Sequence, residues 1–317
     1  MNLFEDAFIK REKFFNDTSS NCFRLFNSGA DGIPGLTVDY YAGYLLVQFY
    51  ESSLIDSQTG MLNDELTTQI INASKTLPCM GILCKDRIMY SGDIDFLQKR
   101  KSQLIYGELP PENHIIVQNK IKCHVDIIEG QSTGIFLDMR ETREFLESIY
   151  STKIFSKMLN LFSYTGMFSV HSLKNGVKYC TNVDLSQSVL NRAKKNYELN
   201  DLPVDDRDFI YGDSLDWLKR FAKRNAHFDF IIADPPTFSR HKNSVFSVKK
   251  DYKRLTDSIS NIAEGGYALT AINSQTVDKD EFLDYHPPKW ELLHFAQESS
   301  DFFPERESYL KTAFWKL

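Results

Sequence analysis

A carboxylate and two prolines, Asp234-Pro235-Pro236, end the apolar run Phe230–Ala233, and an aromatic residue follows at Phe238. The prolines fix φ and carry no N–H, so this segment should leave the run as a rigid arm whose carbonyl oxygens can accept hydrogen bonds. The Asp234 carboxylate and the Pro235 carbonyl could hold the N–H groups of an amine and turn its lone pair toward an electrophilic methyl carbon. Phe238 could stack on a flipped-out base. The structural alternative is a proline-stiffened strand end with Phe238 in the core.

Two more carboxylates follow apolar runs earlier in the chain. Asp184 could accept two hydrogen bonds from ribose hydroxyls, or it could stabilise the start of the next helix. Asp213 could accept from the amino group of an adenine while Ser214 caps the next helix, or Asp213 could act only as a cap or turn residue. The turn Ser163–Ser169 holds one glycine, Gly166, where a ligand could approach the backbone. Because this turn lacks GxGxxG, a dinucleotide is disfavoured, and S-adenosylmethionine, a nucleoside without phosphates, fits better.

Basic residues are densest immediately after the proline arm. A helix is predicted there by the spacing of the apolar residues Val248, Tyr252, Leu255, Ile259 and Ile262. The other side of this helix carries Lys249, Lys250, Lys253 and Arg254, and the residues before it include Arg240, His241 and Lys242. These side chains could contact RNA phosphates, or they could form an ordinary solvated helix face.

The three carboxylates need elements that bring them to one edge of a sheet. From about Lys153 onward, apolar runs alternate with helical patterns, which predicts a parallel sheet with right-handed crossovers. Strands are expected at 156–163, 179–186, 207–213, 228–236 and 265–274, and an antiparallel hairpin is expected from the runs 289–299 and 308–317. Ligands bind such sheets at the carboxyl ends of the strands, where Asp184, Asp213 and Asp234 all lie.

The N-terminal part has a different rhythm. It predicts a short amphipathic helix, strands at 36–41 and 44–50, a helix at 61–73, a strand at 79–86 and a strand pair within 114–130. We therefore expect an α/β protein with three parts. These are an N-terminal helix at 1–20, a small α+β domain at 21–128, and a Rossmann-like, mostly parallel methyltransferase domain at 129–317.

Composition limits the classes of function. The chain has 317 residues, 42% of them hydrophobic, and a formal net charge of −6, which argues against indiscriminate coating of nucleic acid but permits a local basic patch. The five cysteines form no CxxC pair, so we expect neither a disulfide framework nor a metal site. We also expect no leader, no membrane span and a cytoplasmic location.

Five motifs stand in this order along the chain: DGIPGLTVDYY, GQSTGIFLDMRETREFL, LNLFSYTGMFSV, VDLSQSVLNRAKKNYELN and DPPTFSR. Together they resemble the S-adenosylmethionine-dependent large-subunit ribosomal RNA methyltransferases, which include cytosine-5 and guanine-modifying members. The resemblance implies that the cofactor site is formed by Asn160, Ser163, Tyr164, Gly166, Asp184, Asp213 and Asp234. It also implies that the small α+β domain at 21–128 is a substrate-side domain and that Thr133–Arg140 borders the methyl-donor pocket.

Two departures from the family pattern bear on function. Many members carry a further small N-terminal RNA-binding domain, which we do not expect here because the chain begins at the helix before FRLFNSGADG. The cytosine-5 members resemble one another in a CSC motif at the end of the fifth strand, because their reaction needs a thiolate to attack the pyrimidine. Here Thr270–Thr276 reads TAINSQT. Asn273 and Ser274 therefore stand where a nucleophile is needed, and cytosine-5 methylation is disfavoured.

The leading interpretation is an S-adenosylmethionine-dependent methyltransferase that acts on a purine nitrogen, with guanine in ribosomal RNA as the expected target. The expected catalytic residues are Asp234, Pro235 and Phe238, and the expected RNA contacts are Arg240, Lys242, Lys249, Lys250, Lys253 and Arg254. Two alternatives stay open: methylation of a small-molecule or protein nitrogen, and a non-catalytic RNA-binding or assembly protein. A homodimer through edge strands or the N-terminal hairpin is also considered, and neither a metal nor a membrane partner is expected.

Overall fold

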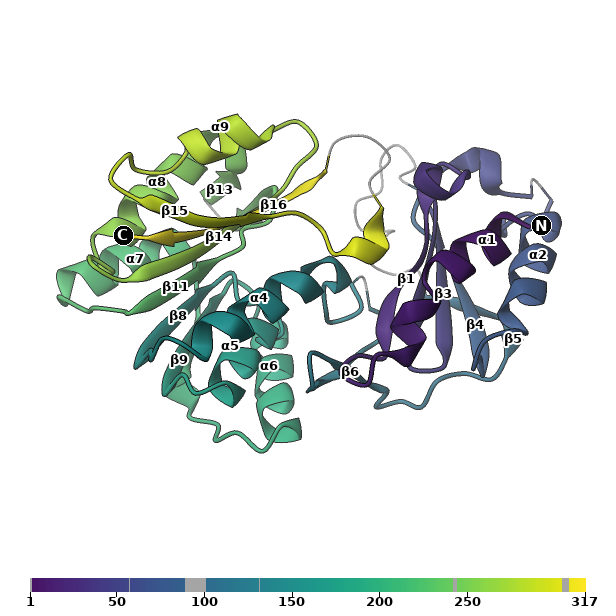
Figure 1. The fold of residues 1–317 in the computed structure, drawn as a ribbon, viewed down its shortest axis with the longest axis horizontal. Coiled ribbons are helices and arrows are strands. Elements are labelled where there is room, and N and C mark those ends of the chain that lie inside the picture. The colour runs from purple at the N-terminus through teal and green to yellow at the C-terminus, as the bar shows by residue number, and fades with distance from the viewer. Residues whose placement is uncertain (1, 57, 89–100, 131, 242–243, 304–307) are drawn as a thin grey trace. The chain divides into compact units, whose positions relative to one another are not determined.

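The computed structural model describes residues 2–56, 58–88, 101–130, 132–241, 244–303 and 308–317. The chain forms two compact units, drawn as ribbons in Figure 1. The first comprises Met1–Asp138 with Ser299–Arg306, and the second comprises Met139–Glu298 with Glu307–Leu317. The segment 129–138, which we expected in the second domain, is grouped with the first unit. The limits of the functional domains stay a prediction.

The first unit is built on a five-stranded sheet in the order β1-β2-β3-β4-β5. Its strands are β1 (Cys22–Asn27), β2 (Leu36–Tyr41), β3 (Tyr44–Phe49), β4 (Gly81–Asp86) and β5 (Gln103–Gly107). Neighbours pair antiparallel except β3 and β4, which are parallel and joined through helix α2 (Asp64–Ser74). A separate hairpin consists of β6 (Ile115–Gln118) and β7 (Ile121–His124). The predicted α+β character is confirmed, whereas β1 and β5 were not predicted.

A segment from late in the sequence, Ser299–Phe303, is held in the first unit by two arginines. The fully buried Arg11 follows helix α1 (Leu3–Lys10); its Nε donates to the Asp301 carbonyl at 2.9 Å and its Nη2 to the Asp31 carboxylate at 2.7 Å. The backbone N–H of Arg24 donates to the Asp301 carboxylate at 2.7 Å. A buried arginine needs such partners because an unpaired buried charge is costly. The segment is therefore an integral part of the first unit.

The second unit contains a seven-stranded sheet in the order β10-β9-β8-β11-β14-β16-β15. Its strands are β8 (Lys157–Leu161), β9 (Tyr179–Asp184), β10 (Phe209–Tyr211), β11 (Phe230–Ala233), β14 (Tyr267–Asn273), β15 (Glu291–Ala296) and β16 (Leu310–Lys316). The first five strands in sequence pair in parallel, and β16 lies antiparallel between β14 and β15. The predicted parallel sheet with an antiparallel C-terminal hairpin is confirmed.

Helices cover both faces of this sheet, as Figure 1 shows. They are α4 (Arg140–Tyr150), α5 (Met167–Lys174), α6 (Gln187–Leu199), α7 (Ser214–Lys223), α8 (Val248–Ser260) and α9 (Lys279–Asp284). Successive strand residues point to opposite faces, so Phe230 and Ile232 pack with α4 and α5, whereas Ile231 packs with α7, α8 and α9. Helix α6 packs beside α5. The core thus divides into two layers, one on each face of the sheet.

The starts of the helices confirm one predicted cap and correct another. The Ser186 side chain accepts from the Val189 N–H at 3.4 Å and caps α6, as predicted. Ser214, by contrast, does not cap α7. The cap is Asp213, which has an extended backbone and accepts from the Asp216 N–H at 3.0 Å, while Ser214 is already helical.

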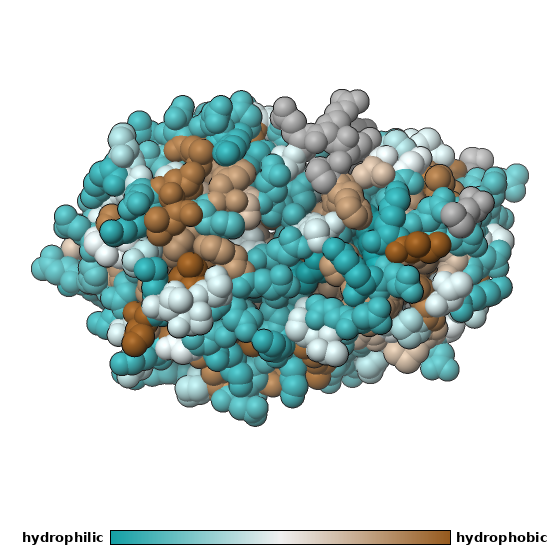
Figure 2. Space-filling model, viewed as in Figure 1, coloured by the Kyte–Doolittle hydropathy of each residue, from teal (hydrophilic) through white to brown (hydrophobic). Residues whose placement is uncertain are grey.

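Strand β15 forms one edge of the second unit's sheet. Leu292 and Leu293 on this strand are 39% and 43% exposed. Figure 2 shows brown, apolar atoms gathered over this part of the unit. The homodimer through an edge strand stays a prediction.

Candidate active site

The candidate site lies where the strand order of the second unit reverses, between β8 and β11. In parallel α/β sheets, this switch point opens a crevice at the carboxyl ends of the strands. Leu161 and Ala233 are register partners at the ends of β8 and β11. Phe162 and Asp234 follow them directly, so these two residues leave the sheet side by side. Asp184 ends β9, the neighbour of β8 on the other side.

The loop after β8 has an unusual backbone. Phe162, Tyr164 and Gly166 have positive φ angles of 56°, 48° and 75°. A positive φ strains a residue that carries a side chain, and such strain collects at functional sites. The Ser163 N–H donates to the Val183 carbonyl at 3.0 Å. This bond fixes the strained loop to the neighbouring strand β9.

Asp184 joins the same loop to the start of α6. Its Oδ2 accepts from the Tyr164 N–H at 2.9 Å, and its Oδ1 accepts from the Ser186 N–H at 2.9 Å. Burial raises the pKa of Asp184 above its ordinary value of 3.8, although the backbone N–H groups act in the opposite direction. Each carboxylate oxygen can accept two hydrogen bonds, so both keep the capacity for a ribose hydroxyl. The geometry is compatible with ligand binding and with a role at the helix start.

Two residues predicted to bind the cofactor have internal roles. A Cβ at Gly166 would lie 3.0 Å from the Cβ of Ala193, so the glycine permits close packing of α6. Asn160 is 2% exposed; its Nδ2 donates to the Ser169 hydroxyl at 2.9 Å, and this hydroxyl donates to the Asn182 side chain at 2.7 Å. Such partners satisfy a buried amide. Direct contact of Asn160 and Gly166 with the cofactor stays a prediction.

Ser163 presents the opposite situation. This residue is 6% exposed, and its hydroxyl has no hydrogen-bond partner among the residues that the structure describes. Buried hydroxyls in folded proteins are nearly always hydrogen-bonded. An unpaired hydroxyl in the strained loop is therefore an atom that a bound ligand would satisfy. Asp213 uses one carboxylate oxygen as the cap of α7, and its contact with adenine stays a prediction.

The arm after β11 is attached to the end of β14. Pro235 is buried, Pro236 is exposed, and the hydroxyl of Thr237 donates to the Asn273 carbonyl. The two prolines and this hydrogen bond restrict the conformations of the arm. Phe238 is 52% exposed, so its ring does not lie in the core as the structural alternative required.

A hairpin that sequence reasoning missed continues the arm: β12 (Phe238–His241) and β13 (Ser244–Ser247). Phe238 pairs with Ser247 and Ser239 pairs with Phe246, which places Phe238 and Phe246 on opposite faces. Phe246 is buried, with its ring centroid 5.5 Å from that of Phe162. One face of the hairpin is thus packed on the strained loop, and the other presents Phe238.

Among the basic residues predicted to contact RNA, four lie on α8 and one lies on β12. Helix α8 buries its apolar stripe, as predicted, and exposes Lys249, Lys250, Lys253 and Arg254. Arg254 pairs with Asp251 at 3.0 Å. Arg240 belongs to β12, and Lys242 lies outside the described residues.

The end of β14 offers no nucleophile. Asn273 is exposed, and Ser274 is buried with its hydroxyl accepting from the Thr276 N–H at 3.2 Å. None of the five cysteines forms a disulfide, and none lies at the end of β11 or β14. Burial raises the pKa of the Cys84 thiol to about 12 and also raises that of Cys180. The end of β14 therefore supplies no reactive thiolate.

Two properties concern the described residues as a whole. Within these residues, no group of three or more His, Cys, Asp or Glu side chains could hold a metal ion. No helix in the described ranges is long and apolar enough to cross a membrane.

Within the segment Thr133–Arg140, Thr133–Asp138 belongs to the first unit. Its role beside the methyl-donor pocket stays a prediction.

The topology of the second unit defines its class. Three strands lie on one side of the switch point and four on the other, and the last strand is inserted antiparallel beside the edge. Acidic residues follow or end the second, third and fourth strands of the sheet in sequence order. This combination defines a Rossmann-like, class I S-adenosylmethionine-dependent methyltransferase.

Comparison with known proteins identifies the family. Residues 30–308 match the family described as S-adenosylmethionine-dependent methyltransferase, and the chain belongs to this family. A known structure that resembles the chain is SMU.776, crystallised in complex with SAH (S-adenosylhomocysteine). It has 28% sequence identity and a TM-score of 0.83, and the match covers 100% of this chain and 82% of that one. S-adenosylmethionine is therefore the cofactor.

Two relatives have names that mention ribosomal RNA. YwbD of Bacillus subtilis, provisionally named a ribosomal RNA large subunit methyltransferase, is 35% identical over 280 residues, which cover 87% of this chain and 66% of YwbD. Ribosomal RNA large subunit methyltransferase I of Aeromonas salmonicida is 33% identical over 287 residues, with 87% and 69% covered. The chain thus spans about two thirds of the length of these relatives.

Sequence reasoning missed Phe162 and Phe246, which link the loop and the hairpin. A signal existed for Phe246, because it is one of two aromatic residues between the prolines and the helix. No signal in the sequence paired it with Phe162, more than eighty positions earlier.

Proposed function

We propose that this protein transfers a methyl group from S-adenosylmethionine to a guanine nitrogen in ribosomal RNA. The proposal rests on the position of Asp234-Pro235-Pro236. This segment lies directly beside the strained loop after β8 in the methyltransferase fold. The names of the two ribosomal RNA relatives support an RNA substrate. The proposal implies that the protein acts in the cytoplasm, where bacterial ribosomal RNA is assembled into ribosomes.

The residues of the loop fit a nucleoside cofactor. Asp184 provides carboxylate oxygens at the end of β9 for the ribose hydroxyls, and the unpaired hydroxyl of Ser163 provides a further contact. The carboxylate oxygen of Asp213 that does not cap α7 can accept from the adenine amino group. When bound, the cofactor supplies a methyl group on a sulfonium, which is an electrophile without any metal.

The proline arm would orient the attacking nitrogen. The Asp234 carboxylate and the Pro235 carbonyl accept hydrogen bonds from the base, and Phe238 stacks on its face. The nitrogen lone pair forms the new N–C bond, while the electrons of the breaking S–C bond pass to sulfur and leave S-adenosylhomocysteine. An attacking amino nitrogen becomes positively charged on methylation and then loses one proton to solvent. The arm contributes by fixing the geometry, since positioned acceptors need no reorganisation during the reaction.

Guanine is favoured over the C5 atom of cytosine by what the end of β14 contains. A cytosine-5 reaction needs a thiolate that adds to the ring, and the five cysteines lie elsewhere. A guanine nitrogen carries its own lone pair and needs no protein nucleophile. Asn273 and Ser274 are therefore no obstacle to the proposed reaction.

The test is transfer of a labelled methyl group to naked RNA and to ribosomal particles from cells that lack this gene, followed by digestion of the RNA to nucleosides. Asp234→Ala should lower transfer by at least about a hundredfold, a loss larger than any weakening of its affinity for S-adenosylhomocysteine. Asp257→Ala is a matched control, because Asp257 is an exposed carboxylate of α8 and its loss changes the net charge equally.

Label in a methylated guanosine supports the proposal. Label in 5-methylcytidine would overturn the argument from the cysteines but keep the RNA substrate. Transfer by Asp234→Ala at the wild-type rate would overturn the role of the arm. An absence of label in both naked RNA and ribosomal particles would contradict the RNA substrate and favour a small-molecule or protein nitrogen.

A further inference from the structure

Charge is distributed unevenly between the two units. The first unit contains 13 Lys and Arg against 20 Asp and Glu, and the second contains 24 against 23. Within the second unit, Ser214–Arg254 alone holds ten Lys and Arg against four Asp and Glu. A polyanion would be repelled by the first unit as a whole and attracted to this stretch.

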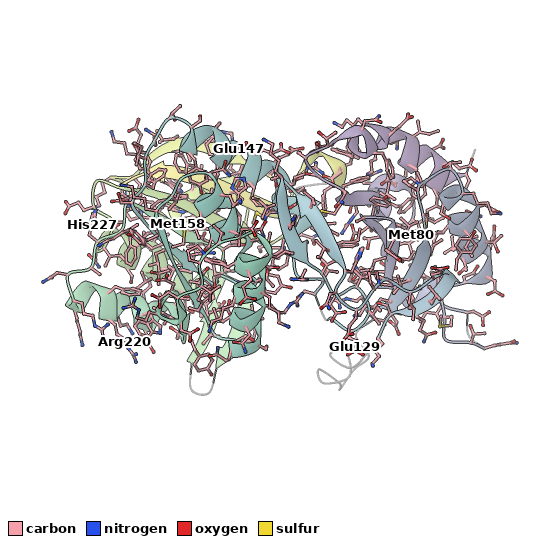
Figure 3. All side chains as sticks on the ribbon, turned by 90° about the horizontal axis from the view of Figure 1, so that it is seen from below. Met80, Glu129, Glu147, Met158, Arg220 and His227 are labelled. Carbon is pink, nitrogen blue, oxygen red and sulfur yellow. The ribbon has the colours of Figure 1, made fainter. Side chains whose placement is uncertain are left out.

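This stretch includes α7 and the first part of α8, two neighbouring helices on one face of the sheet. Leu215, Leu218 and Phe221 of α7 belong to the same core layer as the apolar stripe of α8. The two helices are in contact with each other. Their opposite sides therefore face solvent together, and the exposed side of α7 carries Lys219, Arg220, Lys223 and Arg224. We call these four residues the α7 basic face, of which Figure 3 shows Arg220 at the periphery of the unit.

Much of the positive charge on these helices is not neutralised by the protein. Lys223 and Arg224, like the α8 lysines, have no ion-pair partner among the residues that the structure describes. Lys219 pairs with Asp216 at 3.1 Å, but both side chains are more than 60% exposed. The Arg220 guanidinium lies 4.8 Å from the ring centroid of Trp217, which restrains it without removing its charge. The α7 basic face is thus available to an anionic partner.

The direction of α7 places the α7 basic face away from the candidate active site. Asp213 caps the helix at the carboxyl end of β10, so the axis runs from the candidate site toward the other end of the sheet. At 1.5 Å per residue, Lys223 lies about 13 Å along the axis from Ser214. A ligand that reaches both the proline arm and Lys223 must extend over at least this distance, and an RNA strand does so while carrying negative charge along its length.

We infer that the α7 basic face is a second phosphate-binding surface for the substrate RNA, which contacts the backbone outside the target nucleotide. The inference rests on the proposed function and extends it, because none of the four residues belongs to the predicted site. Such contacts raise affinity without reading sequence, and each one makes binding more sensitive to salt. They should lower the KM for RNA and leave kcat unchanged.

The experiment compares two double variants with the same charge change. Lys223→Gln with Arg224→Gln removes two charges from the α7 basic face, and glutamine keeps the helix propensity. Lys178→Gln with Lys195→Gln is the control, because both lysines are exposed, lack ion pairs among the described residues, and lie outside α7, Lys178 directly before β9 and Lys195 on α6. Binding is measured with protein-free large-subunit ribosomal RNA at several salt concentrations, and thermal melting verifies the fold of each variant.

The α7 variant should bind this RNA about tenfold or more weakly, with the slope of log K against log salt reduced by about 1 to 2. Its KM for RNA should rise while its kcat and its affinity for S-adenosylhomocysteine match the control. If wild type and α7 variant bind equally while methyl transfer to RNA proceeds, the inference is wrong and the proposed function stands. If the wild type neither binds nor methylates RNA, both fail together.

Discussion

The Asp184 carboxylate accepts a hydrogen bond from the backbone N–H of Tyr164 at 2.9 Å. This bond joins the end of β9 to the strained loop after β8, so a residue proposed to bind ribose also holds the loop that would surround the cofactor. Loss of the carboxylate charge should therefore affect the cofactor through both routes.

The cofactor affinity should depend on pH through Asp184. Burial raises the pKa of this carboxyl above 3.8, and the charged form accepts the ribose hydroxyls. Affinity for S-adenosylhomocysteine should be complete above that raised pKa and fall as the pH decreases through it, starting at a higher pH than for an ordinary aspartate. Calorimetric titrations between about pH 4 and pH 7 measure this fall. Asp184→Asn should bind weakly and lose this component, whereas Asp257→Asn should retain it; identical profiles for Asp184→Asn and the wild type would contradict the assignment.

Gly166→Ala should destabilise the second unit through a collision as well as through φ. Gly265 has φ +74, nearly the same as the +75 of Gly166, but a Cβ at Gly265 would meet nothing within 4 Å. Gly265→Ala should therefore cost only the conformational term, about 1 kcal/mol, whereas Gly166→Ala should cost about 1–3 kcal/mol more because it presses against Ala193. Denaturant unfolding of both variants separates the two contributions. Equal losses would show that α6 yields to the added methyl group.

Acid should destabilise the protein through His286. This ring is buried, its Nε2 lies 2.9 Å from the Thr270 hydroxyl, and burial lowers its pKa to about 4. The folded-state pKa is below the ordinary 6.5, so the folded protein binds fewer protons at His286 than the unfolded chain does. The contribution of the neutral ring to the free energy of unfolding is therefore complete above pH 6.5 and is lost as the pH falls toward 4. The loss amounts to about 3 kcal/mol. The free energy of unfolding of His286→Gln should lack this part of the pH dependence, and the exposed His227→Gln should keep it.

Phe238→Ala should weaken RNA binding without affecting the cofactor. The ring is 52% exposed on the hairpin face opposite to Phe246, where a flipped-out base can stack. Base stacking on an aromatic ring contributes about 1–3 kcal/mol, so the KM for RNA should rise by about 5- to 150-fold. Phe238→Tyr should restore most of the loss. Tyr179→Ala, which removes a 65% exposed ring from β9, is the control and should leave the KM unchanged.

Much of the second unit could be predicted because its signals are local. The α8 stripe repeats at helical spacing, and its residues Val248, Tyr252, Leu255 and Ile259 are all buried. The hairpin β12–β13 was missed because each strand has only four residues, too few to show an alternating pattern. The role of Gly166 depends on Ala193 in another helix, and that of Asn160 depends on Ser169 and Asn182. No local pattern contains such contacts, since they arise only when the sheet is assembled.

The segment that holds Asp301 has a consequence for how the protein can be divided. The chain enters the first unit, crosses into the second after Asp138, returns at Ser299 and leaves again after Arg306. A gene fragment that ends at Asp138 would leave the buried guanidinium of Arg11 without the Asp301 carbonyl, and a fragment that begins at Met139 would carry Ser299–Arg306 without its surroundings. The two units are therefore not separable modules of the sequence. Replacing the first unit by another domain requires two changes of the sequence. One is at the N-terminus, and the other is in the segment between β15 and β16.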